Sequence, residues 1–259
     1  MLELFTAEAI GALVTLTFLE IVLGIDNIIF ISIAAGKLPE NLRKKATSIG
    51  LVLAMVLRIV LLFGISYLIQ MQEPWFNIEF GWIDAHVTGQ SVILIAGGLF
   101  LLYKSTKEIH EKVEDRGHDE REVRDQRSNT LSNAIVQITL INIVFSFDSI
   151  LTAIGMTNGL NGALTLMIIA VVLSVVIMML FANPVGEFVN KHPSVQVLGL
   201  SFLILIGFML IAEGAHLSHT VMFGEEIGSV PKGYLYFAIS FSLLVEFLNM
   251  KMRKNKKVA

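Results

Sequence analysis

Seven stretches of the chain are apolar enough to cross a lipid bilayer as helices. A spanning helix needs about 20 mostly apolar residues, and the stretches that reach or approach this length are Ile10–Ala35, Ala46–Gln70, Thr88–Ser105, Leu131–Met156, Gly162–Phe181, Val195–Ala212 and Tyr234–Met250. Only 16% of the residues are charged, whereas soluble domains carry about 25%. We therefore predict an all-α membrane protein with seven transmembrane helices. A membrane barrel is excluded, because these stretches lack the alternation of polar and apolar residues that barrel strands show.

The basic residues are unevenly distributed between the loops. All of the 19 lysines and arginines except Arg58 and Lys232 lie after the first, third and fifth stretches or in the C-terminal tail. Because loops rich in these residues stay in the cytoplasm, the N-terminus is predicted outside and the C-terminus inside the cell. This predicts a multi-pass protein of the plasma (inner) membrane, with the lipid bilayer as a partner and no nucleic acid. The chain has no cysteine, which excludes disulfides, thiolate metal sites and cysteine nucleophiles.

One segment of the first stretch recurs in the fourth. Residues 17–31, TFLEIVLGIDNIIFI, match residues 139–153, TLINIVFSFDSILTA, without a gap, and Asp26 aligns with Asp148. Aspartate is strongly disfavoured in the middle of a membrane, so its recurrence is more informative than the apolar matches. Since three crossings separate the copies, the second unit must be inverted relative to the first, as in many secondary transporters.

The repeat predicts how the chain is divided. We expect a first three-helix repeat at residues 1–105 and a charged cytoplasmic loop at 106–130, helical at its start. A second, inverted three-helix repeat follows at 131–215. Residues 216–259 contain an outer loop, the seventh helix and a basic cytoplasmic tail. The outer loop Met71–His86 carries aromatic residues that suit the membrane interface. For the charged loop, a metal-sensing role through its histidines and acids remains an alternative to a plain solvated segment.

Each copy places polar side chains on one helical stripe, at steps of about 100° per residue. The stripes consist of Thr17, Glu20, Gly24 and Asn27 in the first copy, with Asp26 beside them, and of Thr139, Asn142, Ser146 and Ser149 in the second, with Asp148 beside them. Gly24 permits close helix approach, or it marks a local unwinding of the helix. We predict that the two stripes face each other.

The charges within the apolar zone point to a divalent cation. Glu20, Asp26 and Asp148 against Arg58 leave a net charge of −2. The predicted ligands are Asp26, Asp148, Glu20, Asn27, Asn142 and Ser149. Oxygen ligands favour Mn²⁺, Mg²⁺ or Ca²⁺ over Zn²⁺ or Cu⁺. A thioether from Met55, Met167, Met178 or Met179 would shift the preference toward Mn²⁺, although methionine commonly serves to fill gaps between helices.

Two further ionisable residues have alternative interpretations. Arg58 is either a mobile counter-ion that neutralises the carboxylates when no metal is bound, or one partner of a permanent ion pair. Glu213, at the outer end of the sixth stretch, is a candidate ligand where the ion enters or leaves, or an interfacial surface residue.

The motifs FLEIVLGIDNIIFISI, KLPENLRKKA, GGLFLLYKSTKEIHE, VFSFDSILTAIGM and HPSVQVLGLSFLILIGFMLIAEG resemble those of the TerC family of integral membrane proteins. The resemblance covers nearly the whole chain and is to the compact form, without appended cytoplasmic domains. It implies Mn²⁺ export, with acidic motif positions at Glu20, Asp26 and Asp148. Relatives often have aspartate where this chain has Asn142.

The sequence therefore predicts a non-enzymatic efflux transporter of divalent metal ions that works by alternating access. The expected cargo is Mn²⁺, and no permanently bound cofactor is expected. Glu20 is a further ligand or a proton carrier, so proton coupling stays open, as does the oligomeric state. The alternatives are an intramembrane diaspartyl protease, although the Gly-x-Gly-Asp setting of such enzymes is missing, and a non-transporting metal sensor or metalation factor.

Overall fold

Each of the seven predicted stretches coincides with a helix over most of its described residues. The computed structural model describes residues 6–64, 69, 71–114, 130–157, 160 and 162–256, with backbone alone at Leu23, Ile25, Asp26, Asp148 and residues 254–256. Its long helices are α1 (Ala7–Gly36), α2 (Glu40–Phe63), α4 (Gly89–Glu114), α6 (Leu131–Thr157), α7 (Ala163–Lys191), α8 (Pro193–Leu217) and α9 (Lys232–Lys256). Their boundaries differ from the prediction mainly next to the loops that are rich in lysine and arginine. There α4 and α7 extend about two to three turns past the predicted apolar spans.

Six of these helices are long and apolar enough to cross a membrane, namely α1, α2, α6, α7, α8 and α9, counted over the described residues. The exception is α4, because its apolar run lies between Gln90 and Lys104 and its last turns are charged. The prediction that the charged loop begins as helix is confirmed as far as Glu114. The rest of that loop, including His118, lies outside the described residues.

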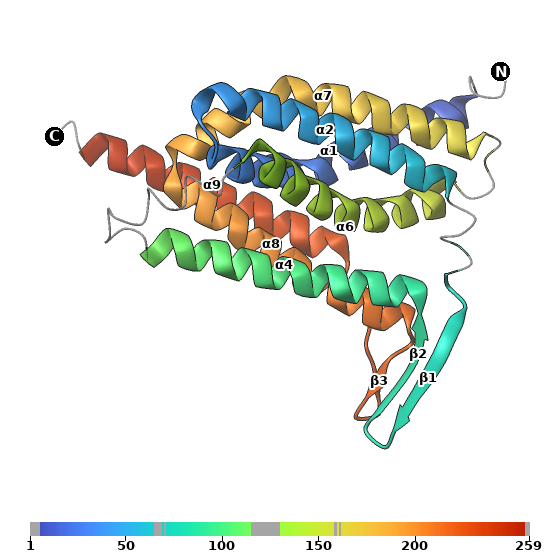
Figure 1. Cartoon of the computed structure of the whole chain (residues 1–259). Helices are drawn as coiled ribbons and strands as arrows, with labels where there is room; N and C mark the ends of the chain where they lie inside the picture. The colour runs from blue at the N-terminus through green and yellow to red at the C-terminus, as the bar shows by residue number, and fades with distance from the viewer. Residues whose placement is uncertain are drawn as a thin grey trace.

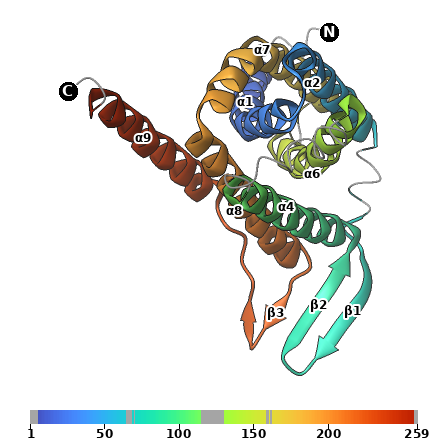
Figure 2. The ribbon, with the colours of Figure 1, turned by 60° about the vertical axis from the view of Figure 1, so that its left-hand side comes forward.

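Four helices form a bundle, and three lie beside it. Figure 2 shows α1, α2, α6 and α7 arranged around a common axis, with α4 and α8 together below them and α9 extending to one side. The most extensive helix contacts are α4 with α8 and α1 with α7, and α2 packs on α6. α9 makes few contacts, mostly with α8.

Small residues permit the closest of these contacts. A methyl group added at Gly98 of α4 would lie 2.5 Å from the Gly207 carbonyl oxygen of α8, and one at Gly207 would lie 2.9 Å from the Gly98 carbonyl oxygen. The two backbones therefore touch at this crossing, which is the usual role of glycine between membrane helices. At Gly50 of α2, an added methyl group would lie 2.7 Å from the Ile138 side chain of α6.

An antiparallel sheet was not predicted, so the all-α assignment is wrong in this respect. The strands β1 (Pro74–Phe80), β2 (Ile83–Thr88), β3 (Val221–Met222) and β4 (Glu225–Glu226) pair in chain order. The sheet extends from one end of α4 and α8, across the direction of the helices (Figure 1). It occupies the predicted outer loop and part of the loop before the seventh helix. The interfacial aromatic residues of that prediction, Trp75, Phe76 and Trp82, are exposed on it or at its turn.

The turn between β3 and β4 explains part of this sheet. Phe223 and Gly224 have φ angles of +53° and +87°, and two consecutive positive values are typical of the tight turns that suit the twist of a hairpin. Glycine adopts this conformation without strain, whereas Phe223 does so at a cost. The ring of Phe223 stacks on Trp82, with centroids 5.9 Å apart.

Candidate functional site

The two polar stripes meet inside the four-helix bundle. Asn27 of α1 and Asn142 and Ser146 of α6 are each no more than 5% exposed, and all three line one cavity. This central cavity is bounded by Asn27, Leu51, Ala54, Met55, Arg58, Asn142, Ser146, Val175 and Met178, from α1, α2, α6 and α7. Its volume is about 10 Å³, which is enough for roughly one water-sized group. The prediction that the stripes face each other is confirmed for these residues.

The polar groups around the central cavity are unequally satisfied. Asn142 Nδ2 donates to the Ile138 carbonyl at 2.8 Å. Ser149 is buried on α6 but does not line this cavity, and its Oγ donates to the Ser146 carbonyl at 3.1 Å. The amide oxygen of Asn27 is buried and has no hydrogen-bond partner among the described residues. An unpaired buried acceptor costs about 1–3 kcal/mol, and this oxygen is therefore available as an acceptor or a ligand at the central cavity.

Arg58 of α2 and Glu20 of α1 form a buried ion pair. The Nη1 atom of Arg58 donates to the Glu20 carboxylate, and both side chains are 7% exposed or less. The pair satisfies each charge in an apolar setting where either alone would be costly. Arg58 is thus the partner of Glu20 in this state. The sequence-based alternatives for Arg58, a mobile counter-ion or a permanent ion pair, are both compatible with this contact, and neither identified Glu20 as the partner.

The ion pair separates the central cavity from a second small one. Glu20 lines a cavity of about 10 Å³ together with Leu16, Leu62, Ile150, Ala153, Met167, Ala170 and Val171, whereas Arg58 lines the central cavity. Leu62, Ile150 and Met167 are each no more than 3% exposed. An apolar layer therefore closes the bundle beyond Glu20, on the side away from Asn27.

Gly24 lies within an uninterrupted α1, so the alternative of a local unwinding there is wrong. Its role is close packing, because a methyl group added at Gly24 would overlap the sulfur of Met178. Of the four methionines considered, Met55 and Met178 line the central cavity and Met167 lines the Glu20 cavity. Two thioethers are thus available at the centre of the bundle.

The remaining predicted site residues are not brought into the described geometry. The side chains of Asp26 and Asp148 lie outside the described part of the structure, although their backbones belong to α1 and α6. Glu213, on α8, lines neither the central cavity nor the Glu20 cavity. Among the side chains that are described, no three His, Asp or Glu residues are close enough to hold a metal ion.

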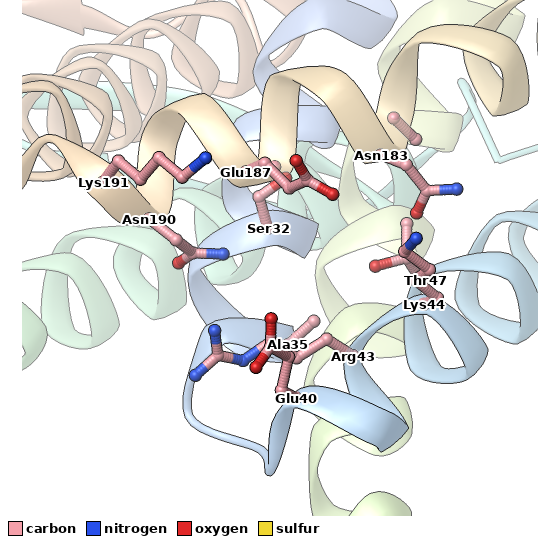
Figure 3. A pocket seen from close by; sticks show the side chains of 12 residues that line it. Ser32, Ala35, Glu40, Arg43, Lys44, Thr47, Asn183, Glu187, Asn190 and Lys191 are labelled. Carbon is pink, nitrogen blue, oxygen red and sulfur yellow. The ribbon is translucent and has the colours of Figure 1, made fainter.

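A larger cavity lies at the end of the bundle that carries most basic residues, and sequence reasoning missed it. We call it the mouth cavity; its volume is about 270 Å³. It is lined by Ser32, Ala35, Glu40, Arg43, Lys44, Thr47, Ala182, Asn183, Gly186, Glu187, Asn190 and Lys191 of α1, α2 and α7. In Figure 3 the side chain of Asn183 points from α7 toward α2, whereas Asn190 extends toward the end of α1, where its amide oxygen lies against Gly36. The asparagines and Glu187 recur along one face of α7, a signal that could have been found in the sequence.

An ion network at the same end ties α1 to α4. Lys37, directly after α1, contacts Glu108 Oε2 at 2.6 Å, and Lys104 contacts Glu108 Oε1 at 2.7 Å. Burial alone would raise the pKa of Glu108, but the two ammonium groups outweigh it and lower this pKa. Burial would likewise lower the pKa of Lys37, and the attraction of Glu108 and Glu111 raises it instead. The network therefore favours the ionised form of both partners.

Together, the long apolar helices and the polar cavity buried between them define a helical integral membrane protein with an internal polar site. The model of the integral membrane protein TerC family matches residues 5–258, and the chain belongs to this family. It is 42% identical over 250 residues to a UPF0053 protein of Haemophilus influenzae, covering 96% of this chain and 97% of the relative.

Two relatives from Escherichia coli K12 differ in length. The UPF0053 inner membrane protein YgdQ is 45% identical over 246 residues, which cover 95% of this chain and 93% of YgdQ. The UPF0053 inner membrane protein YoaE is 43% identical over 245 residues, which cover 95% of this chain but only 43% of YoaE. No solved structure matches the chain.

Proposed function

We propose that this protein exports divalent metal ions, with Mn²⁺ as its physiological cargo. The observation that carries the proposal is the amide oxygen of Asn27, buried without a partner among the described residues beside a cavity in the middle of the bundle. An oxygen in this position is a suitable ligand for a hard cation. The thioethers of Met55 and Met178 at the same cavity favour Mn²⁺ over Mg²⁺ and Ca²⁺, because sulfur is a softer ligand than oxygen.

The charges in this region support a divalent cargo. Asp26 precedes Asn27 on α1, and Asp148 holds the corresponding position on α6. With Glu20 neutralised by Arg58, these two aspartates leave two negative charges for one M²⁺ ion. We assign Asp26 and Asp148 as the central ligands and Asn27, Asn142 and Ser149 as neutral oxygen donors.

Helix packing supports the proposed inverted repeat. In that arrangement α1, α2 and α4 correspond to α6, α7 and α8. Exchanging the corresponding helices turns the α1–α7 contact into the α6–α2 contact and returns the α4–α8 contact to itself; all three contacts are present. A two-fold axis in the membrane plane produces this pattern. We include α4 as a crossing helix, which gives seven spans.

The proposed orientation follows the basic residues. The C-terminus and the end of the bundle that carries Lys37 would face the cytoplasm. Because two close relatives are named inner membrane proteins, we propose the inner membrane as the location of this chain as well.

The proposed mechanism is alternating access around the central cavity. The ion would reach Asp26 and Asp148 from the cytoplasmic end while the apolar layer around Glu20 stays closed. In the outward step Arg58 would release Glu20, which then serves as a transient ligand or takes up a proton. Arg58 keeps the site electrically balanced when the ion leaves, because an unpaired buried carboxylate is costly.

The experiment is Mn²⁺ transport by the full chain in a bacterial strain that lacks its other manganese exporters. Asp26→Asn and Asp148→Asn should abolish protection from excess MnCl₂ and raise cellular manganese, while membrane insertion is unchanged. The control is Gly155→Ala, since a methyl group there meets nothing within 4 Å. Protection by both aspartate variants equal to that of the unmodified protein would rule out the paired-aspartate site.

A further inference from the structure

The mouth cavity ends close to the central cavity on three helices. Ser32 of α1, Thr47 of α2 and Ala182 of α7 line the mouth cavity, and Asn27, Leu51 and Met178 line the central cavity on the same helices. The spacings are five, four and four residues, or about 7.5, 6 and 6 Å along the helix axes. One layer of side chains therefore separates the two cavities.

The floor and the rim of the mouth cavity differ in character. Ser32, Thr47 and Ala182 are 2%, 7% and 2% exposed, so the floor is buried and offers two hydroxyl groups. Glu40, Lys44, Glu187 and Lys191 are exposed and form the rim. The lining is thus charged at the rim and polar but uncharged at the floor, which lies next to the buried layer around Asn27.

We infer that the mouth cavity is the entrance by which a hydrated divalent cation reaches the central cavity, with Glu187 and Asn183 of α7 drawing it in and the hydroxyl groups of Ser32 and Thr47 replacing part of its water at the floor. This inference rests on the proposed function and adds to it a route and the residues along it. Carboxylate, amide and hydroxyl oxygens are ligands that hard cations accept.

The rim carries both an acidic and a basic residue on α7, and they should affect cation entry in opposite directions. Glu187 and Lys191 lie four residues apart on α7, on neighbouring positions of one helical face. For a cation, the Glu187 carboxylate attracts and the Lys191 ammonium group repels. Neither residue belongs to the ion pairs formed among the described residues, so their substitution breaks no such pair.

The first experiment measures the KM of Mn²⁺ uptake into everted membrane vesicles at low ionic strength. Glu187→Gln should raise KM, and Lys191→Gln should lower it, each by about twofold to fivefold, because each charge lies exposed in water near a divalent ion. Both effects should shrink at 0.15 M salt, where the Debye length is about 8 Å. If Glu187→Gln lowered KM and Lys191→Gln raised it, the mouth cavity would be an anion site and the inference would be overturned. Two unchanged KM values would also overturn it.

The second experiment uses the absence of cysteine. Asn183→Cys introduces the only thiol, and a charged methanethiosulfonate that does not cross membranes should modify it in everted vesicles and not in right-side-out ones. MnCl₂ should slow the modification severalfold. Val176→Cys is the matched control, on the same helix but exposed on its apolar surface, and should stay unmodified. Modification of Asn183→Cys from the outside alone, or at a rate that Mn²⁺ leaves unchanged, would contradict the assignment.

A third variant narrows the floor. A methyl group at Gly186 would lie 3.0 Å from Ser32 Oγ, so Gly186→Ala should slow the maximal uptake rate more than Gly155→Ala does. If vesicles with the unmodified protein take up no Mn²⁺, the proposed function fails. If they do take up Mn²⁺, and the mouth-cavity variants behave like the unmodified protein while the Asp26 and Asp148 variants do not, this inference alone fails.

Discussion

The buried ion pair between Glu20 and Arg58 makes a quantitative prediction. Arg58→Gln removes the guanidinium group and leaves the Glu20 carboxylate, now 4% exposed, without its opposite charge. Breaking a buried pair from one side typically costs about 3–5 kcal/mol. Since 1.4 kcal/mol is a factor of ten, we expect the folding equilibrium constant to fall by about two to three and a half orders of magnitude.

The double variant Glu20→Gln/Arg58→Gln should recover most of this loss. It leaves two neutral amides that can hydrogen-bond to each other, so no charge remains buried, and its expected cost is about 1–2 kcal/mol. The coupling between the two substitutions then amounts to about 2 kcal/mol or more, which is typical of residues in direct contact.

The assay is reversible unfolding in mixed micelles of mild detergent and SDS, followed by the loss of helical circular dichroism. The four proteins of the double-mutant cycle are compared at one pH and ionic strength. Lys251→Gln serves as the control, because this lysine is exposed at the end of α9. If the double variant is destabilised by the sum of the two single effects, the pair contributes no coupling and the reasoning is refuted.

Three further predictions concern packing and pH. Gly98→Ala should lower stability by about 1–3 kcal/mol, because its methyl group would meet the backbone of α8 at 2.5 Å; Gly81→Ala, with nothing within 4 Å, is the control in the same unfolding assay. Gly24→Ala should be destabilising in the same way, because its methyl group would overlap the sulfur of Met178. Adding Met178→Ala should relieve part of the loss. A double variant that is no more stable than Gly24→Ala would contradict the contact. The contribution of the Lys37–Glu108 network should be fully present between about pH 4.5 and 10.5, the ordinary pKa values of the two groups, because the pKa of Glu108 is lowered and that of Lys37 is raised. It should be lost as the pH falls below this window through the pKa of Glu108 or rises above it through that of Lys37, and Glu108→Gln should abolish the acid limb in a plot of Tm against pH.

The helices were predictable because each depends on a local property. A run of apolar residues sets where a helix can lie, and the recurrence of Asp26 and Asp148 beside matching polar stripes indicated which faces are polar. The repeat and its small residues predicted that the two stripes face each other, and Asn27 and Asn142 do line one cavity.

Contacts between distant segments could not be predicted in the same way. Glu20 and Arg58 lie 38 positions apart on different helices, and helical periodicity does not state which turns of two helices meet. The mouth cavity was missed for the same reason, because it is lined by residues from three helices, α1, α2 and α7. The sheet was missed for a different reason. Phe76, Ile78 and Phe80 alternate as a strand would, but the aromatic residues Trp75, Phe76 and Trp82 were attributed to the membrane interface instead.

The sheet also predicts where the native state opens last. β2 runs directly into α4, and β3 follows α8 by a few residues. Pairing of Ile83 with Met222 and the hydrogen bond from His86 N to the Ser218 carbonyl, at 2.8 Å, join these segments at one end. The Gly98–Gly207 crossing joins the two helices further along.

An element held at two places along its length opens only when both contacts are lost, which places it among the slowest units in native-state hydrogen exchange. The amides of α4 and α8 near this crossing should therefore outlast those of α9 in deuterated buffer. In the proposed alternating-access cycle, α4 and α8 would form the stationary part of the molecule, against which the four-helix bundle moves.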